Sequence, residues 1–245
     1  MMKRILIWDL SLRVFHTLFT FCLCAALGLA FLLDNDHPWF RLHMLFGLSA
    51  GFLLAIRLLL FFAGSRHARW RGMLFHPAET LRYLLGALTG QARRFAGHNP
   101  GTALIAWIMF GLVGLLVWSG LNMQNEAAEE SHEALAFALL AAIGAHLVGL
   151  ILHTVRHREW IGLSMLTGRK EAPTEEALAH PHRLAGLVTL VAATAWMGAL
   201  FASLDQTPGF ARLPLLGTTI DLGESETEEE DHQVEGQGEE HENDD

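Results

Sequence analysis

Four histidines occupy positions where paired imidazoles could bind iron. His132 and His146 are fourteen residues apart, close to four turns of an α-helix, so on one helix they share a face and lie about 21 Å apart along the axis. His16 and His43 lie in two other apolar segments. Two imidazoles on facing helices are axial ligands for a six-coordinate haem iron, which suits electron transfer rather than oxygen chemistry. The histidine spacing therefore predicts two such centres at different depths.

The histidines lie in or at the edge of apolar blocks long enough to cross a bilayer. Of the 245 residues, 51% are hydrophobic, and five blocks approach or exceed the about 20 residues that a transmembrane helix needs. These blocks are 12–33, 42–62, 102–121, 135–155 and 184–204. A soluble fold would need more polar sequence to cover them than the chain supplies. We therefore expect an all-α membrane protein with five transmembrane helices.

The first block could instead be a secretory signal, because Lys3 and Arg4 precede it. Its apolar run is long, however, and residues 31–34 offer no small-residue cleavage site. We therefore expect this helix to be retained.

The distribution of Lys and Arg predicts the orientation of the helices, because positively charged loops stay in the cytoplasm. The connection between the second and third blocks and the one after the fourth are rich in basic residues, whereas the other connections are acidic. The basic residues are Arg66, Arg69, Arg71, Arg82, Arg93 and Arg94, then Arg156, Arg158, Arg169 and Lys170. We expect a multi-pass protein of the bacterial inner membrane with a cytoplasmic N-terminus and a periplasmic C-terminus. Trp8 and Trp160 on the inner side, and Trp39 and Trp118 on the outer side, then fit interfacial belts.

With this orientation the four histidines match in depth as two pairs. His43 and His132 each begin an apolar segment at the periplasmic side, while His16 and His146 lie toward the cytoplasm. A single membrane histidine more often only hydrogen-bonds a neighbouring helix, but paired depths favour ligation. Zinc is a poorer match, because each pair supplies two ligands and no nearby Cys or carboxylate completes a tetrahedron. The chain has no C-x-x-C-H motif, so any haem would be held without covalent attachment.

Several motifs, taken in order, resemble the bacterial cytochrome b561 family. They are Trp8-Asp9, Arg13-Val14-Phe15-His16, His43 followed by Gly47 and Arg57, Gly97-His98-Asn99-Pro100-Gly101, Ser131-His132-Glu133, His146 and Met165-Leu166-Thr167-Gly168-Arg169-Lys170. The resemblance covers roughly residues 8–170. It implies a four-helix bundle with two non-covalent b haems that exchanges electrons with the quinone pool. The family is similar to the cytochrome b subunits of nickel-iron hydrogenases and formate dehydrogenases.

On this resemblance His16, His43, His132 and His146 fall on the family's axial-ligand positions, with the pairing that depth gives. His153, one heptad after His146, is the main alternative as a ligand, and it could instead line a quinone site.

Other residues near the histidines have competing interpretations. Arg57, fourteen residues after His43, could pair with a haem propionate or extend to the cytoplasmic interface. Gly47 and Gly51 could make room for a porphyrin face or mark a helix contact.

The segment before the third block is interpreted as structural. Asn99 and Pro100 predict the N-cap and first turn of a helix, and we therefore assign residues 97–101, including His98, to structure.

Three regions are expected along the chain: a di-haem membrane domain at 1–170, a linker with the fifth helix at 171–204, and an acidic periplasmic tail at 205–245. The tail carries fourteen acidic residues and one basic residue. Beyond Leu222 it lacks aromatic residues and apolar periodicity, which predicts disorder. It is either a solvating segment or a docking arm for a basic periplasmic protein. The family resemblance accounts for neither the fifth helix nor this tail.

Together these features predict a di-haem b-type membrane cytochrome that transfers electrons between the quinone pool and a periplasmic protein such as a c-type cytochrome. The expected surroundings are a lipid bilayer, with no nucleic-acid partner. Two alternatives are a membrane-anchor subunit of a hydrogenase-like or dehydrogenase-like complex and a stand-alone superoxide or quinone oxidoreductase. A haem-free transporter is disfavoured because the sequence shows no inverted repeat or broken helix.

Overall fold

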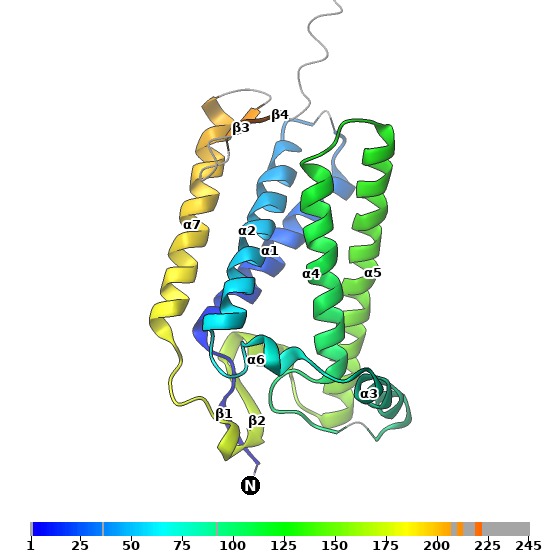
Figure 1. Cartoon of the computed structure of the whole chain (residues 1–245), viewed down its shortest axis with the longest axis vertical. Coiled ribbons are helices and arrows are strands. Elements are labelled where there is room, and N and C mark those ends of the chain that lie inside the picture. Colours follow the sequence, from blue (N-terminus) through cyan, green and yellow to red (C-terminus); the bar gives the residue numbers. More distant parts are fainter. Residues whose placement is uncertain (1, 36, 92, 207–209, 213–218, 222–245) are drawn as a thin grey trace, which may run out of the picture.

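Five long helices run side by side in an elongated bundle (Figure 1). The computed structural model describes residues 2–35, 37–91, 93–206, 210–212 and 219–221. The long helices are α1 Leu10–Leu32, α2 Arg41–Ala63, α4 Pro100–Gly120, α5 Glu126–His157 and α7 Arg183–Gln206. Each contains a stretch long and apolar enough to cross a membrane. The expected all-α membrane fold with five spanning segments is therefore confirmed.

The long helices are apolar on their outer faces as well as their inner ones. Large side chains such as Phe62, which is 76% exposed, and Leu59 and Val148 point away from the bundle. A helix that is apolar all round suits a lipid environment, in which the backbone groups are satisfied within each helix and the side chains face hydrocarbon.

The helices associate as two antiparallel hairpins and one added helix. α1 packs along α2, and α4 packs along α5. The hairpins meet through α2 and α4, while α7 lies against α1 and α2. Among the described residues α5 has extensive helix contacts only with α4. α5 therefore meets α1 and α2 through side chains, such as the Phe31 and Phe137 rings at 5.3 Å, rather than through closely packed backbones.

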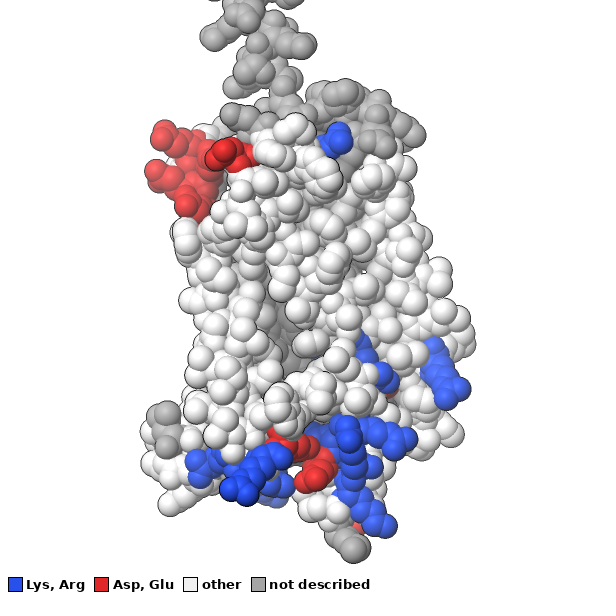
Figure 2. All heavy atoms as spheres, turned by 180° about the vertical axis from the view of Figure 1, so that it is seen from behind, with Lys and Arg blue, Asp and Glu red and all other residues white. Residues whose placement is uncertain are grey.

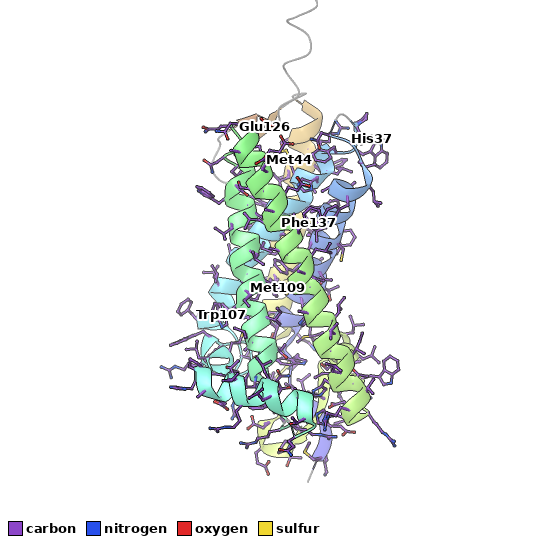
Figure 3. All side chains as sticks on the ribbon, turned by 90° about the vertical axis from the view of Figure 1, so that its right-hand side faces the viewer. His37, Met44, Trp107, Met109, Glu126 and Phe137 are labelled. Atoms are coloured by element: carbon purple, nitrogen blue, oxygen red, sulfur yellow. The ribbon has the colours of Figure 1, made fainter. Side chains whose placement is uncertain are left out.

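Charge divides the bundle into two ends (Figure 2). We call the end that carries residues 64–99 and 158–182 the basic end, because most Lys and Arg residues lie there. We call the opposite end, with residues 33–40 and 121–133, the acidic end. Its exposed carboxylates include Glu126, Glu129, Glu130 and Glu133, and Glu126 lies at the same end as His37 in Figure 3. This division is the one that the loop charges predict.

Side-chain caps explain where α1 and α4 begin. The Asp9 carboxylate accepts the backbone N–H of Leu12 at 2.8 Å and so caps α1. Asn99 accepts the N–H of Thr102 at 2.8 Å, followed by Pro100 in the first turn, so the predicted start of α4 is confirmed.

The cap of α5 extends that helix beyond the expected segment. Asn125 accepts the N–H of Ala128 at 3.0 Å, and acidic residues occupy the first turn, where they favour the helix dipole. The expected start at residue 135 followed hydropathy and missed this polar turn. His132 consequently lies inside a helix rather than at its start.

The basic end is closed by a contact between the N-terminus and the segment after α5. Strand β1 (Met2–Leu6) pairs antiparallel with β2 (Arg169–Pro173). The carbonyl of Gly168 then accepts the backbone N–H groups of both Ile7 and Trp8, at 2.9 and 3.1 Å. We call the contact between residues 2–9 and 162–173, which includes α6 (Gly162–Thr167), the clasp. It joins the two ends of the region in which the family motifs occur.

The structure corrects the interpretation of Trp8 as an interfacial anchor. Its side chain is only 3% exposed, its indole N–H donates to Ser164 Oγ at 3.1 Å, and its ring packs edge-on against His98. Trp39, Trp118 and Trp160 are exposed, as a belt position requires. Trp8 was misassigned because sequence position indicates depth in the membrane but not which side chain the clasp covers.

Shorter elements complete the described chain. At the basic end they are η1 (Trp70–Met73), α3 (Pro77–Thr89) and η2 (Thr174–Glu176). Helix α3 packs against α4 at this end of the bundle (Figure 1). Strands β3 (Phe210–Arg212) and β4 (Thr219–Asp221) pair after α7. The acidic segment after Leu222, expected to be disordered, lies outside the described residues. None of these short elements was expected from the sequence.

We expect Gly168→Ala to weaken the clasp. Gly168 has φ of +76°, and an added Cβ would lie 2.9 Å from the Trp8 carbonyl oxygen. The left-handed backbone alone costs a non-glycine residue about 1–2 kcal/mol. Thermal unfolding of the detergent-solubilised protein should show a lower Tm.

Gly198→Ala is the matched control for this substitution. Gly198 lies in α7, and an added Cβ meets no atom within 4 Å. Its Tm should stay level or rise, because alanine favours a helix over glycine by about 1 kcal/mol. Equal Tm values for the two variants would show that the Gly168 turn does not stabilise the clasp.

Candidate functional site

His43 and His132 face each other at the acidic end. His43 lies in the first turn of α2 and His132 in the second turn of α5, with ring centroids 6.2 Å apart and ring planes at 76°. Bonds between a metal and imidazole nitrogen are about 2 Å long, so a single metal ion fits between two rings at this separation. Sequence reasoning predicted this pair, and the structure brings the two rings together.

The His43 ring is held in one orientation by two contacts. Its Nδ1–H donates to the carbonyl of Ala26 on α1 at 2.9 Å, and Phe40 stacks on the ring with centroids 5.3 Å apart. A carbonyl oxygen can only accept, so Nδ1 carries the proton and the Nε2 lone pair is left free. This is the tautomer that a metal-binding histidine needs.

The His132 ring makes the corresponding contact with α4. Its Nδ1 lies 2.9 Å from Ser119 Oγ, and the same hydroxyl lies 3.2 Å from the Leu116 carbonyl. Gly120 allows this approach, because a Cβ there would be 3.3 Å from the ring carbon Cε1. Sequence reasoning missed Ser119; the available signal was a serine beside a glycine at the depth of His132.

Gly47 and Gly51, which follow His43 on α2, have different surroundings. A Cβ added at Gly47, one turn beyond His43 on the same face, meets no atom within 4 Å. At Gly51 it would lie 3.0 Å from a methyl of Val117, so Gly51 serves the contact between α2 and α4. The surface is hollowed about midway along the bundle (Figure 2). The helix-contact interpretation thus holds for Gly51, and room for a porphyrin beside Gly47 stays a prediction.

His16 and His146 form a second pairing nearer the basic end. His16 lies in α1 and His146 in α5, fourteen residues beyond His132 on one unbroken helix. Their pairing stays a prediction from depth and from the family resemblance. Both rings are partly accessible, and no side-chain hydrogen bond of either is seen among the described residues. This pair therefore lacks the oriented contacts seen at His43 and His132.

His98 lies among positively charged and imidazole groups beside this second pair. Its ring is surrounded by protein but keeps some accessible surface, and its buried Nδ1 has no partner within the described part of the chain. Burial, and then the nearby Arg57, His67, Lys170 and His16, lower the pKa of His98 to about 3. The imidazole is therefore neutral at physiological pH.

Arg57 is enclosed at the basic end of α2. Its side chain is 1% exposed; one terminal nitrogen donates to the Ala68 carbonyl at 2.7 Å and the other to Met73 Sδ at 3.2 Å. The guanidinium also lies over the Phe61 ring at 4.1 Å. Extension to the membrane interface does not occur, and these contacts favour a structural role over pairing with a propionate.

His153 is placed at the basic rim of α5. Its Nε2 lies 3.9 Å from a Glu159 carboxylate oxygen, and its ring packs 4.5 Å from that of His157. These neighbours belong to the end of α5 and the turn after it. His153 thus lies among ionisable groups. Its role in a quinone site, one of the two alternatives that the sequence left open, stays a prediction.

A buried lysine connects the clasp to the segment before α4. Lys170 is 4% exposed, and its Nζ donates to the Phe95 carbonyl at 2.7 Å. Burial lowers the pKa of Lys170 to about 8, although nearby Glu159 acts in the opposite direction. The clasp therefore holds an amine that titrates unusually close to neutrality.

Two-ligand sites of this kind suit an iron whose remaining ligands come from a porphyrin. Among the residues described, no group of three or more His, Cys, Asp or Glu side chains is placed to hold a metal ion by itself. The fold and the facing imidazoles define a class: helical membrane proteins that hold haem between their helices.

The chain matches the prokaryotic cytochrome b561 family over residues 7–168 and belongs to it. The resemblance seen in the motifs is thereby confirmed. The protein is a membrane cytochrome of the b type that binds haem and transfers electrons. No curated protein and no solved structure matches the chain.

The Lys170 amine predicts a pH dependence of stability. Because the folded protein binds this proton more weakly than the unfolded chain, with pKa about 8 against 10.5, the free energy of unfolding should rise as pH increases between these values. Thermal unfolding of the wild type between pH 7 and 10.5 should show the rise, and Lys170→Met should flatten it. A rise of equal size in the variant would assign it to other groups.

Arg57→Met should lower stability without removing haem. The hydrogen bond from the charged group to the Ala68 carbonyl, worth about 1.5–3 kcal/mol, is lost together with a weaker one to the Met73 sulfur. The exposed Arg69, whose Nε donates to the Gly64 carbonyl at 3.0 Å, gives a matched control in Arg69→Met with a smaller change in Tm. Haem per chain and Tm should be measured together. Loss of haem at unchanged Tm would instead favour a contact between Arg57 and a propionate.

Proposed function

We propose that this protein is a di-haem b-type cytochrome that carries electrons between the membrane quinone pool and a periplasmic redox protein. The observation that carries the proposal is the His43–His132 pair. Its rings lie 6.2 Å apart, and both Nδ1 atoms are engaged with protein oxygens. Nothing in ordinary helix packing requires two imidazoles to be presented in this way.

His43 and His132 hold one haem in this proposal, and His16 and His146 hold the other. When bound, haem supplies reversible one-electron chemistry at its iron. The chain sets the separation of the two sites, because His132 and His146 are four turns apart on the continuous helix α5. Each site supplies two imidazoles, which would hold the iron of a bound haem and leave no place on it for another ligand.

The basic end faces the cytoplasm and the acidic end faces the periplasm, with the protein in the bacterial inner membrane. This orientation rests on the charges of the loops at the two ends. The His43–His132 site then lies toward the periplasm. The exposed carboxylates Glu126, Glu129 and Glu130 near it suit a redox partner with a basic surface, such as a c-type cytochrome.

The basic end is the better location for quinone chemistry, which couples electron and proton transfer. His153, His157, Glu159 and Lys170 place proton-carrying groups together at this end of α5. His153 therefore serves better as a proton-handling group here than as a replacement for His146.

Single substitutions of the ligands test the pairing. His43→Ala and His132→Ala should each leave about one haem per chain and remove the same spectral component. His16→Ala and His146→Ala should each remove the other component. Reduced-minus-oxidised spectra and extracted haem per chain of the purified full-length protein measure both quantities.

Two histidine variants serve as controls. His37→Ala alters an exposed histidine at the acidic end and should retain both haems, as should His153→Ala. Loss of one haem in His153→Ala but not in His146→Ala would transfer the ligand role to His153. Wild-type protein without haem, after expression with haem supplied, would overturn the proposal.

The partner is tested separately from the haems. Rapid quinol-dependent reduction of a basic c-type cytochrome by the purified protein supports the proposed route. Reduction of a quinone without any partner would identify a stand-alone oxidoreductase, and stoichiometric copurification of a large metalloenzyme would identify a membrane-anchor subunit.

A further inference from the structure

The two proposed haem sites differ in how their histidines are oriented. At the acidic end both rings have an Nδ1 partner: the Ala26 carbonyl for His43 and Ser119 Oγ for His132. No such bond is seen for His16 or His146 within the described residues. The Ala26 partner is a backbone atom, so Ser119 is the side chain through which this asymmetry can be altered.

The Ser119 hydroxyl has one proton and two neighbours. Oγ lies 3.2 Å from the Leu116 carbonyl and 2.9 Å from His132 Nδ1. The Leu116 carbonyl can only accept, so the hydroxyl proton is directed to it and the oxygen lone pairs face the ring. An oxygen lone pair that faces Nδ1 accepts a proton from it, so Nδ1 is the protonated nitrogen of this ring. Nε2 is then left with its lone pair.

Ser119 is well placed to enforce this arrangement. It is 4% exposed, so water does not compete for the hydroxyl. It belongs to the last turn of α4, beside Gly120, where a Cβ would lie 3.3 Å from the His132 ring. Ser119 and Gly120 thus bring α4 into close contact with the His132 ring, and the Ser119 oxygen is the hydrogen-bond acceptor in this contact.

We propose that Ser119 is a positioning residue that fixes the Nδ1–H tautomer and ring plane of His132 and lowers the reduction potential of the haem at the acidic end. This rests on the proposed di-haem function. A ligating imidazole that donates its Nδ1–H becomes a stronger electron donor to the metal. A stronger donor stabilises ferric over ferrous iron, so the hydrogen bond lowers the potential.

Ser119→Ala is the direct test, and Ser131→Ala is its matched control. Ser131 is next to His132 in sequence, and its hydroxyl donates to the carbonyl three residues back, as that of Ser119 does, but to Ala128 at 2.8 Å and away from the ring. Potentiometric titration of the purified protein should show one of two midpoint potentials raised in Ser119→Ala. Both should be unchanged in Ser131→Ala and in Ser119→Thr, which keeps the hydroxyl.

An electron paramagnetic resonance spectrum gives a second readout. The 76° between the His43 and His132 planes predicts a strongly anisotropic low-spin ferric signal, because crossed imidazoles leave two iron d orbitals nearly equal in energy. In Ser119→Ala the ring is free to turn, and this signal should shift or broaden. The signal of the other haem should stay as it is.

The possible outcomes separate the two proposals. Two haems per chain with unshifted potentials and an unshifted signal in Ser119→Ala would overturn the role of Ser119 and leave the di-haem function standing. Should Ser119→Ala lose one haem, Ser119→Cys, whose sulfur is a weaker acceptor in the same place, is expected to retain it with a raised potential. Absence of haem from the wild type would overturn the di-haem function itself.

Discussion

The unbroken hydrogen bonding of α5 is the constraint on which the arrangement of the candidate sites depends. Inside a membrane a helix cannot open its backbone without leaving polar groups unsatisfied, so the two histidines that it carries keep a fixed separation. Their partners come from α1 and α2, which pack as a pair. The distance between α5 and that pair is controlled by α4, where Val117 packs so closely on Gly51 that an added Cβ would lie 3.0 Å from its methyl group. The contact between α2 and α4 thus sets how far α5 lies from α1 and α2.

The two proposed haem sites differ in their surroundings although each is built from two histidines. At the acidic end the rings are oriented by protein oxygens, and the nearby charges are exposed carboxylates. On the side of His16 lies the neutral His98, near which Arg57 and Lys170 carry positive charge. Cations close to a redox centre favour its reduced form, whereas electron-rich ligands favour its oxidised form. One fold therefore contains the means to give two similar centres unequal potentials.

Much of the fold could be predicted from the sequence because membrane insertion depends on local properties. Apolar length determined the five spans, and the loop charges separated the two ends. Apolar length and loop charge both report position along the membrane normal, and this depth was enough to pair His43 with His132. The errors concern the directions across that axis: Trp8 was placed at an interface although the clasp buries it. Ser119 and Ala26 were not identified because a hydrogen bond between helices depends on their rotation, which hydropathy does not report.

The clasp also has a consequence for how the chain is made. Residues 2–8 leave the ribosome before their partners Gly168 and β2, which emerge only after α5. Until then Ile7 and Trp8, both buried in the finished protein, lack their hydrogen-bond partners Gly168 and Ser164. Closure of the basic end is thus a late event that follows synthesis of all four spanning helices between the two halves of the clasp. An extension fused ahead of residue 2 would therefore lie next to β1, the strand that stays unpaired until β2 has been synthesised.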